Sequence, residues 1–171
     1  DDRMAELHPL QDTDTVQGVL HMFHQVHLIM KEVSGMDAVS LQARSGSQAI
    51  YGNFALLRAY QEDIGTYGVR DEVITTIFSH PSDAACAAVL GYKVITLYPD
   101  ADGYPDLDAL RAALSPRTAA LIITNPEDTG IFNTKIRQFT DLVRAAGGLN
   151  IYDQANANGL LGITRAREAG F

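Results

Sequence analysis

The sequence predicts an α/β fold in which a mainly parallel sheet lies between helices. Apolar runs of strand length alternate with helical patterns along most of the 171 residues, which is typical of strands joined by right-handed helical crossovers. The run 118–124 is nearly all apolar, so it predicts a strand that is buried on both faces. The run 149–152 carries no charge and leads directly into Asp153, which predicts a carboxylate at the end of a strand.

Composition indicates an ordinary globular protein of one domain, or most of one. The chain is 46% hydrophobic and 20% charged. Its 13 Lys and Arg and 21 Asp and Glu give a formal net charge of −8, which argues against nucleic acid or an anionic membrane as a partner. No apolar run reaches membrane-spanning length. The single cysteine, Cys86, fits a reducing compartment, so we expect a cytoplasmic protein.

The two ends indicate an internal piece of a longer polypeptide. Asp1 stands where an initiator methionine would be, and the residues after it lack the basic and apolar regions of a signal peptide. Phe171 directly follows a polar segment with no closing element. We therefore expect an α/β domain that is incomplete at both ends.

A helix is predicted at 16–33, before the sheet begins. Apolar residues recur there at steps of three and four, and Ser34-Gly35 is a helix-ending signal. His21, His24 and His27 lie three residues apart on this helix. Zinc-binding helices use a four-residue step with an acid between the histidines, so we predict no metal site.

A turn of small residues, Ser45-Gly46-Ser47-Gln48, is predicted between a short strand at 38–41 and a helix that runs to about Glu62. Backbone amides at a helix N-terminus stabilise a bound phosphate, and the two serines add hydroxyl donors. The turn matches neither GxxxxGK[ST] nor GxGxxG. A serine that only caps the helix would give the same pattern.

The rest of the chain alternates strands and helices. Strands are predicted at 72–78, 92–97, 118–124 and 149–153, and helices at 84–90, 107–114 and 134–146.

Polar side chains follow four of the predicted strands. They are the serine turn, His80 with Ser82, Thr124 with Asn125, and Asp153 with Asn156. Because ligands bind at the carboxyl ends of parallel strands, we expect these groups to share one pocket. A phosphate donor set, a planar ring, hydroxyl and amide donors and an acid suit pyridoxal phosphate, whose ring nitrogen must stay protonated. Taken one at a time, each cluster is equally explained by backbone capping.

Short motifs along nearly the whole chain occur in the order of one known family. They are Leu7-His8-Pro9, Thr15-Val16-Gln17-Gly18, 32–38, Arg58-Ala59-Tyr60, 106–110, Thr124-Asn125-Pro126, Gly130-Ile131-Phe132, Ala146-Gly147-Gly148, and Asp153 with Asn156. Together they resemble the glycine cleavage system P-protein, a pyridoxal-phosphate glycine decarboxylase. The likeness is to its C-terminal half, or to the second subunit of its two-chain forms, as a divergent and truncated member.

The resemblance implies the large domain of a type I pyridoxal-phosphate-dependent transferase at 36–171, after an N-terminal arm and helix at 1–35. The turn Ser45, Gly46, Ser47 and Gln48 matches the family's phosphate-binding turn. His80 matches the histidine that stacks on the cofactor ring, and Thr124 matches a residue near the ring hydroxyl. Asp153 matches the partner of the pyridine nitrogen, and Asn156 belongs to the same cofactor set. No metal site is implied.

By the same resemblance the activity is that of a glycine dehydrogenase (aminomethyl-transferring), an oxidoreductase or lyase. Such an enzyme decarboxylates glycine or a related amino acid through an external aldimine. The expected partners are the lipoylated H-protein and further subunits, in a homodimer or a heterotetramer. Lys31, Lys93 and Lys135 do not match the family's Schiff-base lysine, which is expected beyond Phe171.

Three departures from the family pattern lie beside the expected cofactor. Ala49-Ile50 replaces a glutamate after the turn, His80-Pro81-Ser82-Asp83 replaces HGTN, and Asp153-Gln154-Ala155-Asn156 replaces DGAN. These departures leave two alternatives open. The chain could belong to an enzyme of the same fold that acts on a different amino acid, or to a non-catalytic partner subunit.

Overall fold

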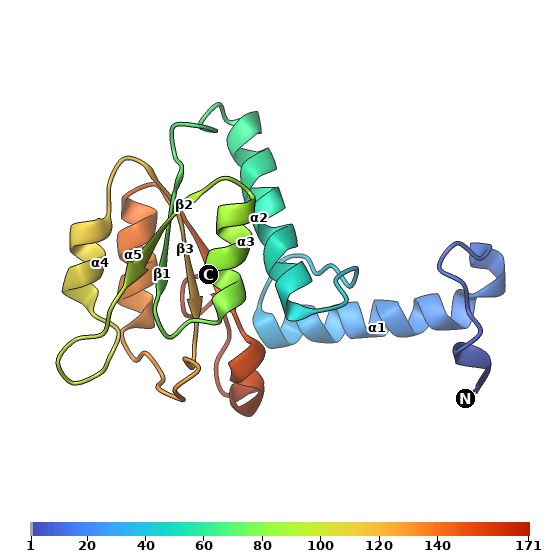
Figure 1. The fold of residues 1–171 in the computed structure, drawn as a ribbon. Coiled ribbons are helices and arrows are strands. Elements are labelled where there is room, and N and C mark those ends of the chain that lie inside the picture. The colour runs from blue at the N-terminus through green and yellow to red at the C-terminus, as the bar shows by residue number, and fades with distance from the viewer. Residues whose placement is uncertain (1) are drawn as a thin grey trace. The chain divides into compact units, whose positions relative to one another are not determined.

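The computed structural model describes residues 2–171, which fall into two units that divide between Leu41 and Gln42 (Figure 1). In the first unit, the 3-10 turns η1 (Asp2–Met4) and η2 (Thr13–Thr15) precede helix α1 (Gln17–Ser34). Gly35 caps the C-terminus of α1 with a left-handed φ of 73°, and its N–H donates to the carbonyl of Lys31 at 2.8 Å. The helix predicted at 16–33 is confirmed.

The strand predicted at 38–41 is wrong, because these residues form no regular structure. A strand must exchange backbone hydrogen bonds with a neighbour, and the strands of the sheet all lie between Glu72 and Asp153. The carbonyl of Val39 instead accepts a hydrogen bond from Nδ1 of His27 at 3.0 Å. The serine turn therefore follows a loop rather than a strand.

The second unit is a four-stranded sheet with helices on both faces. Its elements are α2 (Gly46–Asp63), β1 (Glu72–Thr76), α3 (Pro81–Val89), β2 (Lys93–Leu97), α4 (Leu107–Ala113), β3 (Thr118–Thr124), α5 (Ile136–Ala145), β4 (Leu149–Asp153) and the 3-10 helix η3 (Ala155–Leu160). The strand order is β2-β1-β3-β4, and every neighbouring pair is parallel. The predicted α/β fold with a parallel sheet is confirmed.

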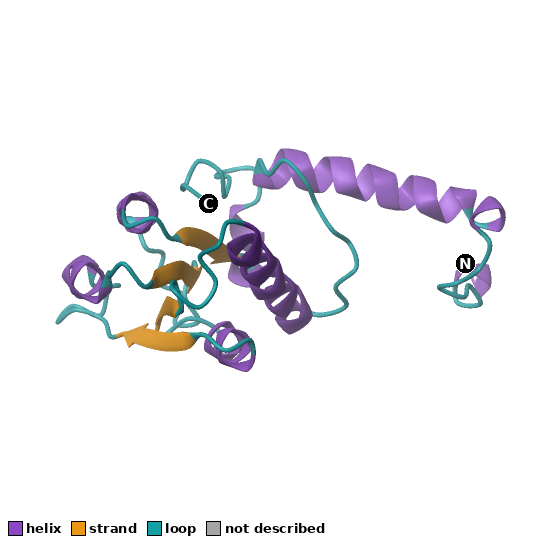
Figure 2. Ribbon diagram, turned by 90° about the horizontal axis from the view of Figure 1, so that it is seen from above, coloured by secondary structure: helices purple, strands orange, loops and turns teal. Residues whose placement is uncertain are grey.

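The alternation of side chains along β3 divides the core into two layers. Ala120 and Ile122 pack with Phe54 of α2 on one face. Leu121 and Ile123 pack with Phe139 of α5 on the other face. All seven residues of β3 are buried, as the sequence predicts for a central strand. Figures 1 and 2 show the sheet between these helical layers, with α2 and α3 on one side and α4 and α5 on the other.

Helix α3 begins earlier than predicted, and this change positions the site. The apolar pattern from Ala84 onward predicts its body but not its first turn. Pro81 occupies the first helical position, where a missing N–H costs nothing. The side chain of His80 caps the helix by accepting the backbone N–H of Ser82 at 3.2 Å. The polar residues Ser82 and Asp83 therefore belong to the helix and are buried.

None of the helices within residues 2–171 combines the length and the apolar character needed to cross a bilayer.

Candidate active site

The carboxyl ends of β3 and β4 place Thr124 beside Asp153. These two residues are partners in the parallel register, and the backbone N–H of Asn125 donates to the carbonyl of Asp153 at 3.4 Å. Thr124 is buried, with 1% of its surface exposed, whereas Asp153 is half-buried. One oxygen of Asp153, Oδ1, accepts the backbone N–H of Ala155 at 2.9 Å. Asp153 thus lies at the end of the sheet where α/β proteins bind ligands.

His80 lies at the same end, between β1 and α3. Its backbone N–H donates to Oγ1 of Thr124 at 2.9 Å. Its ring nitrogen Nδ1 accepts the N–H of Ser82 and lies 2.6 Å from the Ser82 hydroxyl. An acceptor at Nδ1 needs a lone pair there, which assigns the ring proton to Nε2. The residue is exposed, so a ring held at one edge has its remaining surface free to meet a ligand.

Asp83 connects these residues and is a component that the sequence analysis missed. Its carboxyl is completely buried, and its Oδ2 accepts the hydroxyl of Thr124 at 3.1 Å. Burial, and after it the negative charge of Asp153, raises the pKa of Asp83 to about 7. Asp83 therefore joins Thr124 and Asp153, on two strands, to helix α3.

A second chain of hydrogen bonds leads from the same strand end to another buried acid. The backbone N–H of Thr124 donates to Oγ of Ser79 at 3.1 Å. The Ser79 and Thr76 hydroxyls are 2.9 Å apart, and Thr76 Oγ1 donates to Oε1 of Glu127 at 3.0 Å. Since the single hydroxyl proton of Thr76 is directed at Glu127, Ser79 must donate to Thr76. Glu127 is almost fully buried, and burial raises its pKa.

The serine turn forms the first turn of α2. Oγ of Ser45 accepts the backbone N–H of Gln48 at 3.1 Å, so Ser45 is the helix cap. Oε1 of Gln48 accepts the N–H of Arg44. The carbonyl of Ser47 lies 3.5 Å from Sγ of Cys86 on α3, and Asp83 lies one helical turn before Cys86. The turn is therefore packed against the same helix that carries His80 and Asp83.

The turn is open at its surface. All four of its residues are exposed, and a Cβ added at Gly46 would meet no atom within 4 Å. The first amides of a helix have no partner within that helix. The N–H groups of Gly46 and Ser47 and the Ser47 hydroxyl are thus suited to an anion.

Asn156 lies in η3 and contacts the loop after β3. Its Nδ2 donates to the carbonyl of Pro126 at 3.1 Å and to Oδ1 of Asp128 at 3.0 Å. Both contacts fix the loop after β3 to η3. In this structure Asn156 supports the rim of the site through that loop.

Lys93 and Lys135 have contacts outside this cluster. Nζ of Lys93 pairs with Glu72 at 3.3 Å, and both residues open their strands at the amino end of the sheet, opposite Thr124 and Asp153. Lys135 precedes α5 and lines a hollow with Asp100, Asp102 and Tyr104.

The relatives of this chain match it over almost its whole length. The protein of Nitrosomonas europaea named "Probable glycine dehydrogenase (decarboxylating) subunit 2" is 42% identical over 164 residues, which is 96% of this chain and 34% of that protein. The protein of the same name from Pyrococcus abyssi is 39% identical over 169 residues, 99% of this chain and 34% of that protein. The predicted resemblance is confirmed. The chain spans about a third of the length of these relatives.

Solved structures share the fold. Burkholderia pseudomallei sphingosine-1-phosphate lyase aligns with a TM-score of 0.69 at 16% identity, over 82% of this chain and 34% of that chain. Helicobacter pylori PseC, an aminotransferase involved in pseudoaminic acid biosynthesis, aligns with a TM-score of 0.58 at 22% identity, over 74% of this chain and 32% of that chain. The second unit thus has part of the type I fold that the sequence predicts.

The sequence pattern of one family extends across both units. The model of the DegT/DnrJ/EryC1/StrS aminotransferase family matches residues 5–161. This match includes α1, the serine turn, His80, Thr124 and Asp153. The chain therefore belongs to the DegT/DnrJ/EryC1/StrS aminotransferase family.

Proposed function

We propose that this chain provides the larger part of a pyridoxal phosphate site in a glycine decarboxylase-like enzyme. The observation that carries the proposal is the position of Asp153, a half-buried carboxylate at the carboxyl end of the parallel sheet, in register with Thr124. A carboxylate there can hold a proton on the ring nitrogen of the cofactor, which when bound supplies an electron sink for the carbanion left by decarboxylation.

The donor set of the structure fits this cofactor. The uncapped amides of Gly46 and Ser47 at the start of α2 suit its phosphate. The exposed ring of His80, held through Nδ1, suits its planar face. Asp153 keeps lone pairs free in addition to the one that accepts the Ala155 N–H. The three groups carry the charges and shapes that an anionic, aromatic, ring-protonated ligand requires.

The chain's residues would bind and orient rather than form the covalent link. Thr124 has both its hydroxyl functions in use, since Oγ1 accepts from His80 and donates to Asp83. Its place in the proposed site is therefore to hold His80 and Asp83 in position. The lysine that would link to the cofactor belongs, in this proposal, to sequence beyond Phe171.

Glycine is the proposed substrate, because two relatives that each match over 96% or more of this chain carry the name glycine dehydrogenase (decarboxylating) subunit 2. The word "subunit" in their name supports an assembly of more than one chain, and we propose a homodimer or a heterotetramer with the lipoylated H-protein as a transient partner. The free cysteine, Cys86, is compatible with a cytoplasmic location.

Two measurements on the full-length protein test the function. Borohydride treatment followed by mass spectrometry should yield a phosphopyridoxyl-lysine peptide from a segment beyond Phe171. Exchange of labelled bicarbonate into the carboxyl of glycine should require the cofactor and rise when lipoylated H-protein is added. A protein without bound cofactor would refute the site, while exchange with another amino acid but not glycine would refute the substrate.

A further inference from the structure

The carboxyl groups of Asp83 and Asp153 lie on either side of Thr124, which donates to Asp83 and is the register partner of Asp153. The negative charge of Asp153 raises the pKa of Asp83. Asp83 is 0% exposed and lies on α3, whereas Asp153 is half-buried at the end of β4. Two neighbouring carboxylates repel each other, and the repulsion is strong where water is excluded. The pair must therefore be stabilised by a cation or by a proton.

Among residues 2–171, no cation is one of the main charges that act on Asp83. The negative charges of Asp153 on β4 and of Asp128 in the loop after β3 act on Asp83. Both are acidic and favour proton uptake. On its own helix the neighbouring titratable group is the Cys86 thiol, whose pKa is raised by burial and by Asp83. Nδ1 of His80 is directed at Ser82.

The hydrogen bonds leave one oxygen for the proton. Oδ2 of Asp83 accepts the Thr124 hydroxyl at 3.1 Å, and its Oδ1 has no hydrogen-bond partner among residues 2–171. A buried oxygen without a partner costs free energy. A proton on Oδ1 removes this cost, because a neutral acid can accept from Thr124 through its carbonyl oxygen and donate to Asp153 through its hydroxyl.

We propose that Asp83 is a positioning residue, which donates a carboxylic acid proton from Oδ1 to the Asp153 carboxylate and fixes the orientation of that carboxylate. The inference rests on the proposed function, since it takes Asp153 as the partner of the cofactor ring nitrogen. With Ala155 N–H on one oxygen and Asp83 on its buried side, Asp153 is held by two donors. Its remaining lone pairs stay available to a ligand.

Two substitutions of Asp83 distinguish the loss of its titrating proton from the loss of a hydrogen-bond donor. They are Asp83→Asn and Asp83→Ala. The asparagine amide can donate to Asp153 as the neutral acid does, but it does not titrate. The alanine removes the donor. Pyridoxal phosphate binding to the full-length protein should be nearly unchanged in Asp83→Asn below about pH 7 and roughly tenfold weaker in Asp83→Ala, as expected for loss of a hydrogen bond to a charged group.

Infrared difference spectroscopy on the full-length protein without cofactor tests the proton directly. Between about pH 5 and about pH 9, the wild-type protein should lose the carbonyl-stretch band of a buried carboxylic acid. Asp83→Asn should lack that component, and in Asp153→Asn it should disappear at lower pH because the neighbouring negative charge is gone. Glu127→Gln is the matched control, since it removes another buried acid with a raised pKa and should leave the Asp83 component in place.

The two proposals fail in different ways. An unchanged difference spectrum in Asp83→Asn would overturn the proton assignment, even if the protein binds pyridoxal phosphate. An Asp83 component that ignores Asp153→Asn would overturn the pairing. A full-length protein that shows the paired proton but never binds the cofactor would refute the proposed function and leave the carboxyl pair standing.

Discussion

At the scale of single residues, Asp83 should make stability depend on pH. Its pKa is raised from 3.8 to about 7 in the folded protein, so the folded state binds a proton that the unfolded state releases. The stabilisation is complete below about pH 4 and is lost as the pH rises through about 7. The shift sets an upper limit of about 4 kcal/mol on the change in the free energy of unfolding.

Urea unfolding of the wild-type protein and Asp83→Asn across this range measures the effect. The variant should match the wild-type protein at about pH 4 and below, and should be more stable near pH 8. Asp71→Asn gives the contrast, because its hydrogen bonds with Arg117 lower the pKa of Asp71. Its loss should reduce stability above about pH 4. Parallel pH profiles for wild type and Asp83→Asn would contradict the assignment.

Substitutions of Ser45 and Ser47 should distinguish the capping of helix α2 from the binding of phosphate. Ser45 accepts the Gln48 N–H, so Ser45→Ala should lower the free energy of unfolding by about 1 kcal/mol. Ser47 uses its carbonyl, not its hydroxyl, to contact Cys86. Ser47→Ala should therefore leave stability nearly unchanged and weaken pyridoxal phosphate retention. Equal retention in the wild-type protein and Ser47→Ala, measured by cofactor absorbance after dialysis, would argue that the turn binds no phosphate.

At the scale of elements, the turn between α5 and β4 requires a glycine at position 147. Gly147 has a φ of 82°, and a Cβ there would overlap the Arg70 guanidinium. Nη1 of Arg70 donates to the carbonyls of Thr118 at 2.8 Å and Ala146 at 3.0 Å, which ties the start of β1 to β3 and to this turn. An alanine at position 147 combines backbone strain with displacement of that cation.

Gly147→Ala should lower the free energy of unfolding by roughly 2–4 kcal/mol. Gly52→Ala is the matched control, since Gly52 lies within α2 with no atom within 4 Å of an added Cβ. That control should raise stability by up to about 1 kcal/mol, because alanine favours helix. Comparable midpoints for the two variants in thermal unfolding would show that the Arg70 contacts contribute little.

A local sequence pattern is sufficient to predict some strands of this chain but not others. Strand β3 has the predicted bounds because a run of seven apolar or β-branched residues can be buried only in the centre of a sheet. The stretch 38–41 has a similar local pattern, but it has no neighbouring strand to pair with. β-Propensity describes a residue's fit to a sheet that other segments must provide. Long-range pairing thus decided what the local pattern could not.

At the scale of the whole molecule, the site was predictable in its strand ends but not in its connections. Thr124 and Asp153 follow strands, so their neighbourhood follows from parallel topology. Asp83 lies in the first turn of a helix, where an acid is usually a solvated group that complements the helix dipole. Its burial depends on how α3 packs against α2, β1 and β2. The signal available in the sequence was the acid at the last position of the segment matched to HGTN.

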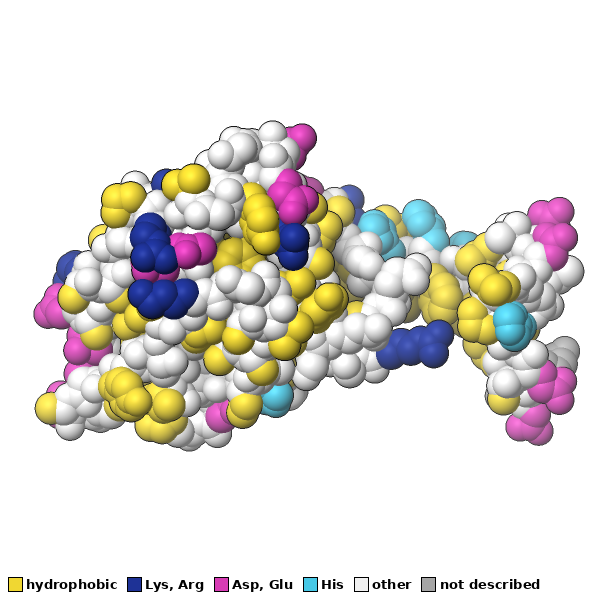
Figure 3. Space-filling view, turned by 45° about the horizontal axis from the view of Figure 1, so that its top comes forward, with side chains coloured by type: hydrophobic (Ala, Val, Ile, Leu, Met, Phe, Trp, Pro, Cys, Tyr) yellow, Lys and Arg dark blue, Asp and Glu magenta, His cyan; other side chains and the backbone are white. Residues whose placement is uncertain are grey.

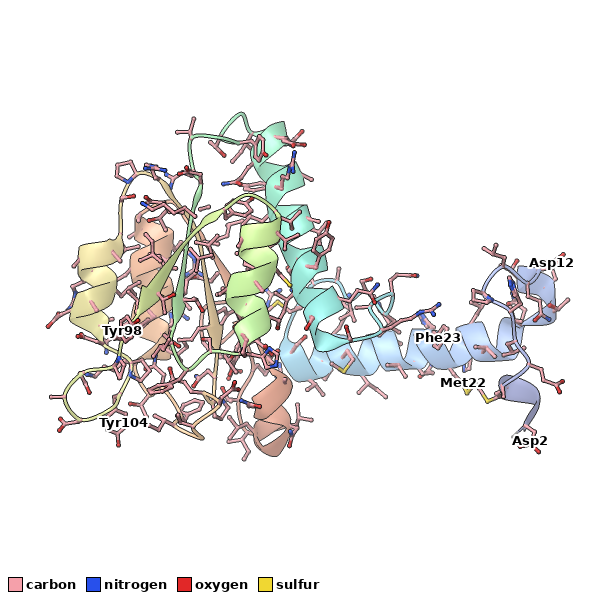
Figure 4. The ribbon with its side chains drawn as sticks, in the orientation of Figure 1. Asp2, Asp12, Met22, Phe23, Tyr98 and Tyr104 are labelled. Carbon is pink, nitrogen blue, oxygen red and sulfur yellow. The ribbon has the colours of Figure 1, made fainter. Side chains whose placement is uncertain are left out.

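At the same scale, helix α1 exposes large apolar side chains. Phe23, Val26 and Ile29 are 55%, 43% and 59% exposed, and hydrophobic and histidine side chains are at the surface of this unit in Figure 3. Figure 4 labels Met22 and Phe23 on the helix. Apolar residues at helical spacing normally face a partner surface. In the proposed homodimer we expect a second copy of the chain to cover the face that bears Phe23 and Val26.

Phe23→Asp and Val26→Asp should therefore raise the fraction of monomer in the full-length protein, measured by light scattering after size-exclusion chromatography. A buried interface charge costs several kcal/mol, so each variant should shift the dimer dissociation constant at least tenfold. Gln25→Asp introduces the same charge two residues after Phe23, a spacing that places it away from that face. If Gln25→Asp dissociates the dimer as strongly as Phe23→Asp, the effect is one of helix charge and the apolar face of α1 is not the contact.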